Sequence, residues 1–317
     1  GKAAELYRKA ADQGFAPAQT GLAILFFNGQ GVPQDYGKAA ELYRKAADQG
    51  FAPAQTNLAI LFFNGQGVPQ DHGKAVELYR KAADQGFAPA EAALGEMLER
   101  GLGVAKDPSQ AAIWYRRAAD QGLADAQTRL GAMLLVGRGI PKNYAESVAW
   151  FRKAADQGYA KAQSYLGAAY DFGYGLREDY HQAAIWYRKA AEQGNAPAIT
   201  SLASMYERGR GLLKNEEEAA RLYRQAAEQG FAPAQNGLGE MLRDGRGVKQ
   251  DYTESVVWFR KAAAQNQMSG IHNLGLAYAY GLGVARNVSE GESWLRKAAK
   301  MGYAPAPKAL EKLRQLQ

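Results

Sequence analysis

The stretch that decides the fold is AKAQSYLGAAYDFGYGLREDYHQAAIWYRKAAEQG, residues 160–194. Variants of it recur along the chain at a constant pitch of 36 residues, without one insertion or deletion. The pitch divides the chain into a half unit (1–15), eight full units (16–303) and a capping half unit (304–317), which predicts one solenoid domain over 1–317. The tripeptide that closes a unit ends at Gly14, Gly50, Gly86, Gly122, Gly158, Gly194, Gly230, Asn266 and Gly302.

Each unit is predicted to form two helices joined by a two-glycine turn. In the second helix Ala39, Leu42, Tyr43 and Ala46 form one apolar stripe at helical spacing. An Asp or Asn precedes every such helix, as at an N-cap, and in four units a Glu follows three residues later, as in a capping box. The cap column is Asp35, Asp71, Asp107, Asn143, Asp179, Asn215, Asp251 and Asn287.

The first helix is predicted from about residue 17 to residue 28, with Pro in its opening turn. The turn after it, Gly29-Gln30-Gly31-Val32, follows a helix and recurs in every unit, so it predicts a helix hairpin and not a phosphate loop. The closing glycines are expected in the left-handed conformation, with Asn266 as the next best residue. The fold class is therefore all-α, a solenoid of helix pairs.

These residues resemble the Sel-1-like repeat family, a relative of the tetratricopeptide repeat. The resemblance covers the whole chain and implies a right-handed α/α superhelix, with first helices on the concave side and second helices on the convex side. Because the chain has no cysteine, it resembles the branch without disulfides. The resemblance alone favours a bacterial, periplasmic or envelope-associated protein. The matching residues are Ala160, Ala162, Gln163, Leu166, Gly167, Tyr170, Gly173, Gly175, Asp179, Ala183, Trp186, Tyr187, Arg188, Lys189 and Gly194.

Composition excludes several classes of function. The chain has a net charge of +7, but Arg stands at one position of every unit and most of these have an acid four residues later, so we expect a partly neutralised outer face and no nucleic acid. No apolar run approaches the length of a transmembrane helix. The five tryptophans share one repeat position, which indicates packing and not ligand stacking. The chain begins inside a repeat, so any targeting segment is expected to be missing from it.

Catalytic and metal sites are not predicted. The three histidines, His72, His181 and His272, stand at three different repeat positions and are interpreted as surface substitutions. No paired carboxylates and no nucleophile with a base can be identified from spacing. We therefore expect no enzyme activity, no metal and no cofactor.

The candidate binding site is the concave lining, formed by first-helix positions that packing leaves unused. These columns vary between units: they are apolar and amide-bearing in the first two full units and charged further along. The alternative is that Phe27 and Phe63 only thicken the core between repeats. The candidate residues are Ile24, Phe27, Asn28, Ile60, Phe63, Asn64, Glu96, Glu99, Arg100, Asp171, Phe172, Glu207, Arg208, Glu240, Arg243, Asp244 and Tyr280.

The sequence thus predicts a non-enzymatic scaffold or adaptor that binds a protein partner in its groove. Two alternatives stay open. The family resemblance allows an immunity protein that neutralises a secreted antibacterial effector, such as a type VI secretion toxin. Residues 1–36 and 37–72 differ at only two positions, which also allows a designed or consensus-like scaffold.

Overall fold

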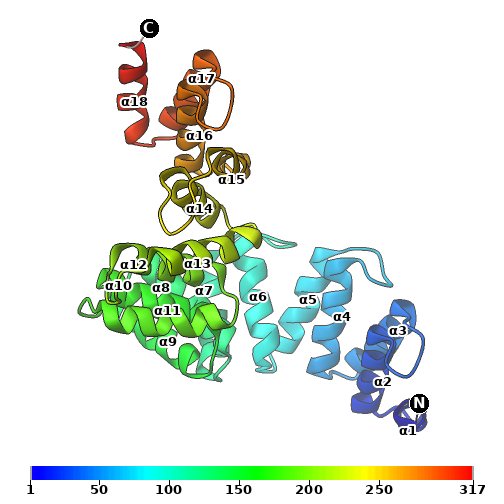
Figure 1. Cartoon of the computed structure of the whole chain (residues 1–317). Helices are drawn as coiled ribbons and strands as arrows, with labels where there is room; N and C mark the ends of the chain where they lie inside the picture. The colour runs from blue at the N-terminus through cyan, green and yellow to red at the C-terminus, as the bar shows by residue number, and fades with distance from the viewer. Residues whose placement is uncertain (1, 316–317) are drawn as a thin grey trace. The chain divides into compact units, whose positions relative to one another are not determined.

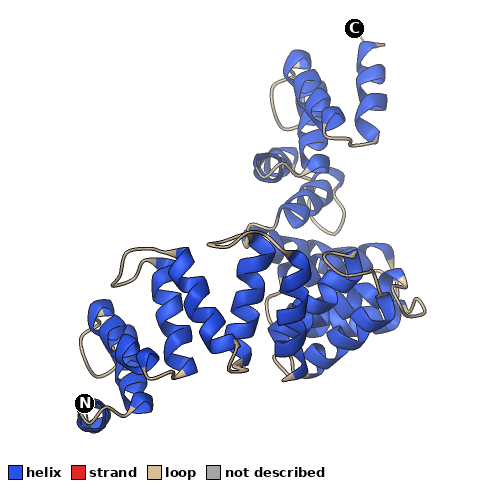
Figure 2. Ribbon diagram, turned by 180° about the vertical axis from the view of Figure 1, so that it is seen from behind, coloured by secondary structure: helices blue, strands red, loops and turns tan. Residues whose placement is uncertain are grey.

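The computed structural model describes residues 2–315, and in this range the chain forms eighteen α-helices and no strand (Figure 2). The first helices of the repeats are α2 (Ala16–Asn28), α4 (Ala52–Asn64), α6 (Ala88–Arg100), α8 (Ala124–Val136), α10 (Ala160–Phe172), α12 (Ala196–Arg208), α14 (Ala232–Asp244), α16 (Met268–Tyr280) and α18 (Pro305–Arg314). The second helices are α1 (Lys2–Asp12), α3 (Tyr36–Asp48), α5 (His72–Ala83), α7 (Pro108–Asp120), α9 (Tyr144–Asp156), α11 (Tyr180–Glu192), α13 (Glu216–Glu228), α15 (Tyr252–Ala264) and α17 (Val288–Lys300).

The chain divides into two compact units, residues 1–159 and 160–317. The second helices α3, α5 and α7 of the first unit and α11, α13, α15 and α17 of the second each pack between the first helix of their own repeat and that of the next, as for α3 between α2 and α4 (Figure 1). Neighbouring first helices also contact each other, for example α4 with α6 and α12 with α14. In a curved stack the inner layer is the more closely spaced one, so the first helices form the inner layer of each unit. The prediction of one domain over 1–317 stays a prediction.

The helix ends follow the predicted capping chemistry. Asp71 has an extended backbone (φ −152°), and its Oδ1 accepts the Lys74 N–H at 2.9 Å. All eight Asp or Asn residues of the cap column accept a backbone N–H in this way. Asn266 has φ 58°, which confirms the left-handed end predicted for it.

The predicted capping boxes form only in part. The cap N–H that a box glutamate would accept is already used, because the Asp251 N–H donates to the Leu242 carbonyl at 2.9 Å. The Glu254 carboxylate instead accepts from the Trp258 indole at 3.1 Å and from Arg224 at 2.7 Å. Glu254 and Glu146 therefore join one second helix to the next. Glu218 and Glu290 instead bind Arg221 and Trp294 of their own helices.

The helices pack closely because small residues face large aromatic rings. In α8 a Cβ on Gly131 would lie 2.7 Å from the Phe151 ring, and in α14 a Cβ on Gly239 would lie 2.5 Å from the Phe259 ring. The second glycine of six turns has the same role against backbone; a Cβ on Gly67, for example, would lie 2.3 Å from the Tyr36 carbonyl. At these distances a Cβ would force the facing ring or backbone to shift.

A buried column of amides joins neighbouring repeats, except that it holds Glu91 in α6, Ile199 in α12 and Ile271 in α16. Gln55 is buried, its Nε2 donates to the Ala47 carbonyl, and its Oε1 accepts from Gln85 at 2.9 Å. The arrangement recurs with Gln127 and Gln157. It satisfies buried polar groups that would otherwise destabilise the core.

The outer layer carries the tryptophans and the basic residues. Trp258 is buried beneath the Lys261 ammonium, which lies 3.9 Å from the ring centroid, and the other four tryptophans have a Lys or Arg in the same place. The predicted packing role of this column is confirmed. The predicted pairing of arginines with the acid four residues later is replaced in Arg116 by a 2.7 Å bond to Glu146 of the next repeat.

Candidate functional site

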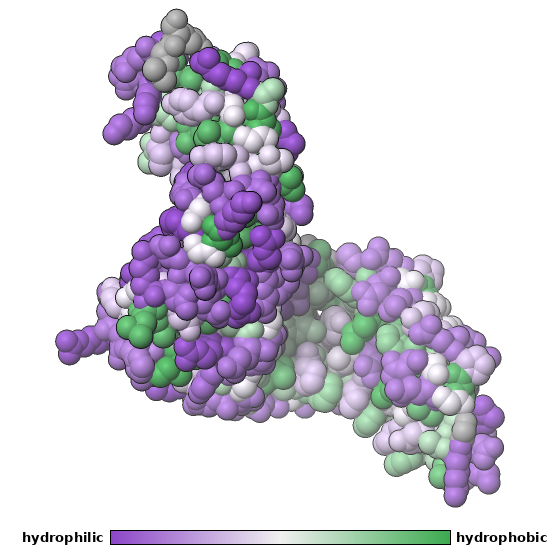
Figure 3. All heavy atoms as spheres, viewed as in Figure 1, coloured by the Kyte–Doolittle hydropathy of each residue, from purple (hydrophilic) through white to green (hydrophobic). Residues whose placement is uncertain are grey.

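The inner layer carries the predicted lining residues, which differ in exposure. Exposed members are Ile24, Asn28, Asn64, Arg100, Phe172, Arg208, Asp244 and Tyr280. Half-buried members are Phe27, Ile60, Phe63, Glu96, Glu99, Glu207, Glu240 and Arg243, and Asp171 is buried. Polar residues cover most of the face seen in Figure 3, and apolar residues reach it in separate patches.

The first two full repeats form an uncharged lining section. Phe27 packs edge-on against Tyr36, with ring centroids 5.3 Å apart, and Phe63 stacks on His72 at 4.8 Å. Both phenylalanines also contact the hydrophobic core, as the alternative interpretation expected. Ile24 does not share this burial, because 40% of its surface is exposed. The rings thus form the base of this section and Ile24 its free apolar surface.

In later repeats, two of the lining acids, Glu99 and Glu207, each accept hydrogen bonds from a tyrosine and from an arginine. Glu99 accepts from the Tyr115 hydroxyl at 3.0 Å and from Arg138 at 3.0 Å. Glu207 is held in the same way, by Tyr223 at 2.9 Å and by Arg246. The tyrosine belongs to the second helix of the same repeat, whereas the arginine stands in the next repeat's turn. These acids therefore stabilise the stack of repeats.

Asp171 is the most buried lining acid. One of its oxygens lies 3.2 Å from a guanidinium nitrogen of Arg210. Burial raises the pKa of Asp171, although Arg210 and a hydrogen bond from Tyr187 act in the opposite direction. This carboxyl is consequently an internal group and offers little surface to a partner.

Two columns of lining residues were missing from the sequence prediction. One is the turn position of Arg138, Arg210 and Arg246. The other contains Arg129, which pairs with Asp125 at 2.7 Å, and Asn273, which is 6% exposed. The sequence could have revealed the first column, because each of these turn arginines stands 39 residues after a lining Asp or Glu.

His272 was wrongly interpreted as a surface substitution. Only 8% of its surface is exposed, its ring lies 5.1 Å from that of Tyr303, and its Nδ1 has no hydrogen-bond partner. Burial, together with the positive charge of Arg243, lowers its pKa. The reason for the burial is its column, which faces the neighbouring repeat and holds small residues such as Thr128 elsewhere.

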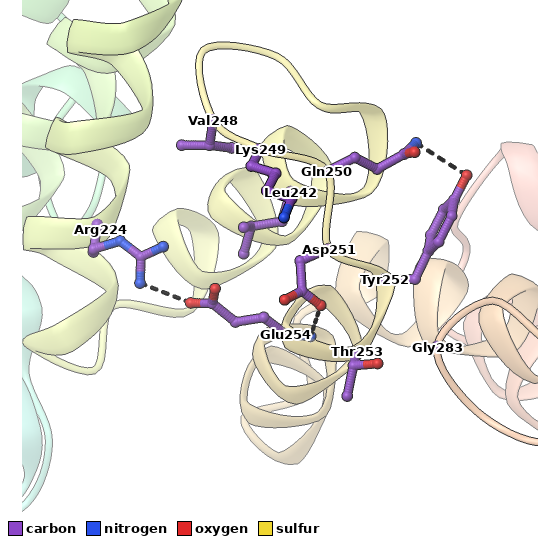
Figure 4. Close-up of a pocket in the computed structure, with 10 residues that line it drawn as sticks. All are labelled: Arg224, Leu242, Val248, Lys249, Gln250, Asp251, Tyr252, Thr253, Glu254 and Gly283. Atoms are coloured by element: carbon purple, nitrogen blue, oxygen red, sulfur yellow. Dashed lines mark hydrogen bonds and ion pairs between the residues drawn. The ribbon is translucent and has the colours of Figure 1, made fainter.

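A polar pocket of about 610 Å³ lies beside the start of α15, away from the lining (Figure 4). Arg224 and Glu254 point toward each other across it, 2.7 Å apart, and Asp251 accepts the backbone N–H of Glu254 at 2.8 Å. Its main polar groups are thus used in capping and in joining repeats. Within residues 2–315, no group of three or more His, Asp or Glu side chains is placed to hold a metal ion.

None of the described helices is both long and apolar enough to cross a membrane.

The chain is similar to known repeat proteins over nearly its whole length. The Sel1 repeat model matches residues 1–15, 16–51, 52–87, 88–123, 124–159, 160–195, 196–231, 232–267 and 269–303. No match is found among curated proteins.

Two solved structures are similar over nearly the whole chain. A Sel1 repeat protein from Oxalobacter formigenes is 32% identical, with 98% of this chain and 89% of that chain covered and a TM-score of 0.67. A protective antigen with an SLR fold from uropathogenic Escherichia coli is 30% identical, with 99% and 83% covered and a TM-score of 0.57. The immunity protein PA5088 from Pseudomonas aeruginosa is 24% identical, with 68% of this chain and 80% of that chain covered and a TM-score of 0.45. The chain belongs to the Sel1 repeat family, whose fold is a protein-interaction scaffold.

Proposed function

We propose that this protein is a non-enzymatic scaffold that binds a protein partner along the lining of its first helices. One observation supports this proposal most directly: the packing columns stay constant from repeat to repeat, whereas the lining columns change. A constant stack with a changing inner surface gives each repeat its own contact, which is how solenoids recognise extended partners.

The uncharged section in residues 16–87 is the proposed contact of the N-terminal repeats. Ile24 is exposed there, Asn28 follows one helical turn later, and Asn64 is the equivalent of Asn28 in the next repeat; both asparagines are exposed. An apolar surface edged by amides favours a neutral segment, because a charged side chain would lose hydration without finding an opposite charge. The partner segment is therefore a neutral, partly apolar stretch laid along the groove, either as a helix or extended.

The test is affinity capture from lysate and envelope fractions with a matched pair of variants. The lining variant carries Ile24→Glu, Asn28→Glu and Asn64→Glu, all at exposed positions. The control variant carries Ile113→Glu, Leu213→Glu and Val257→Glu, which are exposed apolar residues outside the lining. Both variants change the net charge by the same amount, and circular dichroism shows whether both remain helical.

A protein captured by the wild type and by the control variant, but not by the lining variant, supports the proposal. Equal loss with both variants contradicts it, because charge alone would then explain the effect. The captured protein also separates the two roles, since an envelope or signalling protein indicates an adaptor and a secreted toxin indicates an immunity protein.

A further inference from the structure

A cavity of about 230 Å³ opens on the lining between α14, α15 and α16. Phe259 and Ala277 are buried at its base, and Leu276 and Leu282 complete its apolar wall. Tyr252 and Tyr280 stand at its edge and are both partly exposed, so the cavity can be entered from the groove.

The cavity has a cause in the sequence. Ala277 stands at a repeat position that is Leu or Met in six of the eight full repeats. The Leu in α2 is half-buried, and the other five of these side chains are buried. In α6 this residue is Met97, only 4% exposed. The alanine in α16 therefore removes the three outer heavy atoms of a methionine from the same place. The larger residues are Leu25, Leu61, Met97, Met133, Met205 and Met241.

The polar wall of the cavity is fixed and leaves no site for an ion. The Arg243 guanidinium donates to both oxygens of Asp244, at 2.7 and 3.0 Å, and to Asn273 Oδ1 at 3.2 Å. The Asn273 amide nitrogen donates to Asn236 at 2.9 Å and to Glu240 at 2.8 Å. A carboxylate would have to displace Asp244, and a cationic side chain would meet the positive charge of Arg243.

We propose that this cavity receives one aromatic side chain of a peptide segment that lies along the first helices of residues 160–317. The size supports one side chain, because about 150 Å³ of apolar cavity holds benzene and drug-sized ligands need about 300 Å³ or more. The charge pattern supports an aromatic ring, since the ring face attracts the Arg243 guanidinium and its edge packs against the tyrosines. The inference rests on the proposed function and adds the residue class that anchors the partner.

The cavity can be tested without knowing the partner. Saturation-transfer NMR on the full chain measures binding of toluene and 3-methylindole, the side chains of Phe and Trp, and of acetate and butylamine as charged probes. We expect the two aromatic probes to bind and the charged ones not to bind. Ala277→Met, or Ala277→Leu if the first variant folds poorly, fills the cavity and lowers aromatic binding at least tenfold.

A comparison variant removes the same atoms at the equivalent position of another repeat. Met97→Ala in α6 leaves Phe63 at the position of Arg243 and Glu96 at that of Leu276, so it is expected not to restore aromatic binding in the Ala277→Met background. Equal probe binding to the wild type and to Ala277→Met, or no aromatic binding to the wild type, overturns the cavity assignment and leaves the capture experiment unaffected. With the isolated partner, Ala277→Met is expected to weaken binding at least tenfold, and unchanged affinity overturns the assignment of a peptide anchor.

Discussion

Replacing Glu91 by Gln is expected to stabilise the protein at neutral pH. Glu91 stands in the buried column of amides, is 2% exposed, and accepts from the Gln121 amide at 2.7 Å. The equivalent Gln55 accepts in the same way and also donates to a backbone carbonyl, which an ionised carboxylate cannot do. One additional hydrogen bond contributes about 1 kcal/mol. Glu91 also keeps a buried charge that glutamine lacks.

The stability gained by replacing Glu91 depends on pH. Burial raises the pKa of Glu91 more than Arg117 and Gln121 lower it. Because the folded pKa lies above the unfolded one, the penalty of Glu91 is complete above the folded pKa and disappears below the unfolded pKa near 4.5. The stability difference between E91Q and the wild type should therefore be largest at pH 7 and should shrink toward pH 4.

The assay is thermal unfolding followed by circular dichroism between pH 4 and 8. About 1 kcal/mol corresponds to a rise of about 2–4 °C for a cooperative unit of 150–250 residues, which is the size range of residues 1–159. Gln127→Glu, at the same position in the next repeat, is the matched control and should lower the unfolding temperature at pH 7. An E91Q variant that unfolds with the wild type at pH 7, or a difference that does not vary with pH, would refute this reasoning.

Three further predictions concern the stack of repeats. Glu207→Gln and Arg246→Met are each expected to lower stability, and a double-mutant cycle should give a coupling of about 0.5–3 kcal/mol, whereas additive effects would contradict the described pair. Gly239→Ala should cost about 1–3 kcal/mol in urea unfolding, because its Cβ would lie 2.5 Å from a buried ring, and an unchanged midpoint would contradict that packing. His272 has a lowered pKa, so the unfolded state binds more protons and stability should fall as the pH drops below about 6.5. His272→Thr should remove that part of the pH dependence, and an identical pH profile for both proteins would show that His272 does not cause it.

The sequence predicted local structure well because local chemistry determines it. An Asp such as Asp71 before an apolar stripe caps a helix wherever it stands, and a glycine after the stripe ends the helix. The constant pitch then extends each local conclusion to every repeat. The helix pairs, their caps and their turns could therefore be predicted from one unit.

The lining was harder to predict because its state depends on contacts between repeats. Glu207 looks like an exposed acid in sequence, yet it is held by a tyrosine 16 residues later and by an arginine 39 residues later. His272 is buried by Tyr303, which stands beyond the next helix. The cavity beside Ala277 can likewise be recognised in the sequence only when Ala277 is compared with Met97 and the other residues of its column. Such features become visible in sequence once columns of neighbouring repeats are compared in pairs.

The most direct test of the central proposal is the affinity of the isolated partner, measured by calorimetry, for the wild type and for the two matched variants. Residues at the centre of an interface contribute about 2 kcal/mol or more, which corresponds to about 30-fold in affinity. We expect the lining variant with Ile24→Glu, Asn28→Glu and Asn64→Glu to bind at least tenfold more weakly, and the control variant to bind within twofold of the wild type. If the control variant loses affinity and the lining variant keeps it, the partner binds outside the lining and the proposed site is wrong.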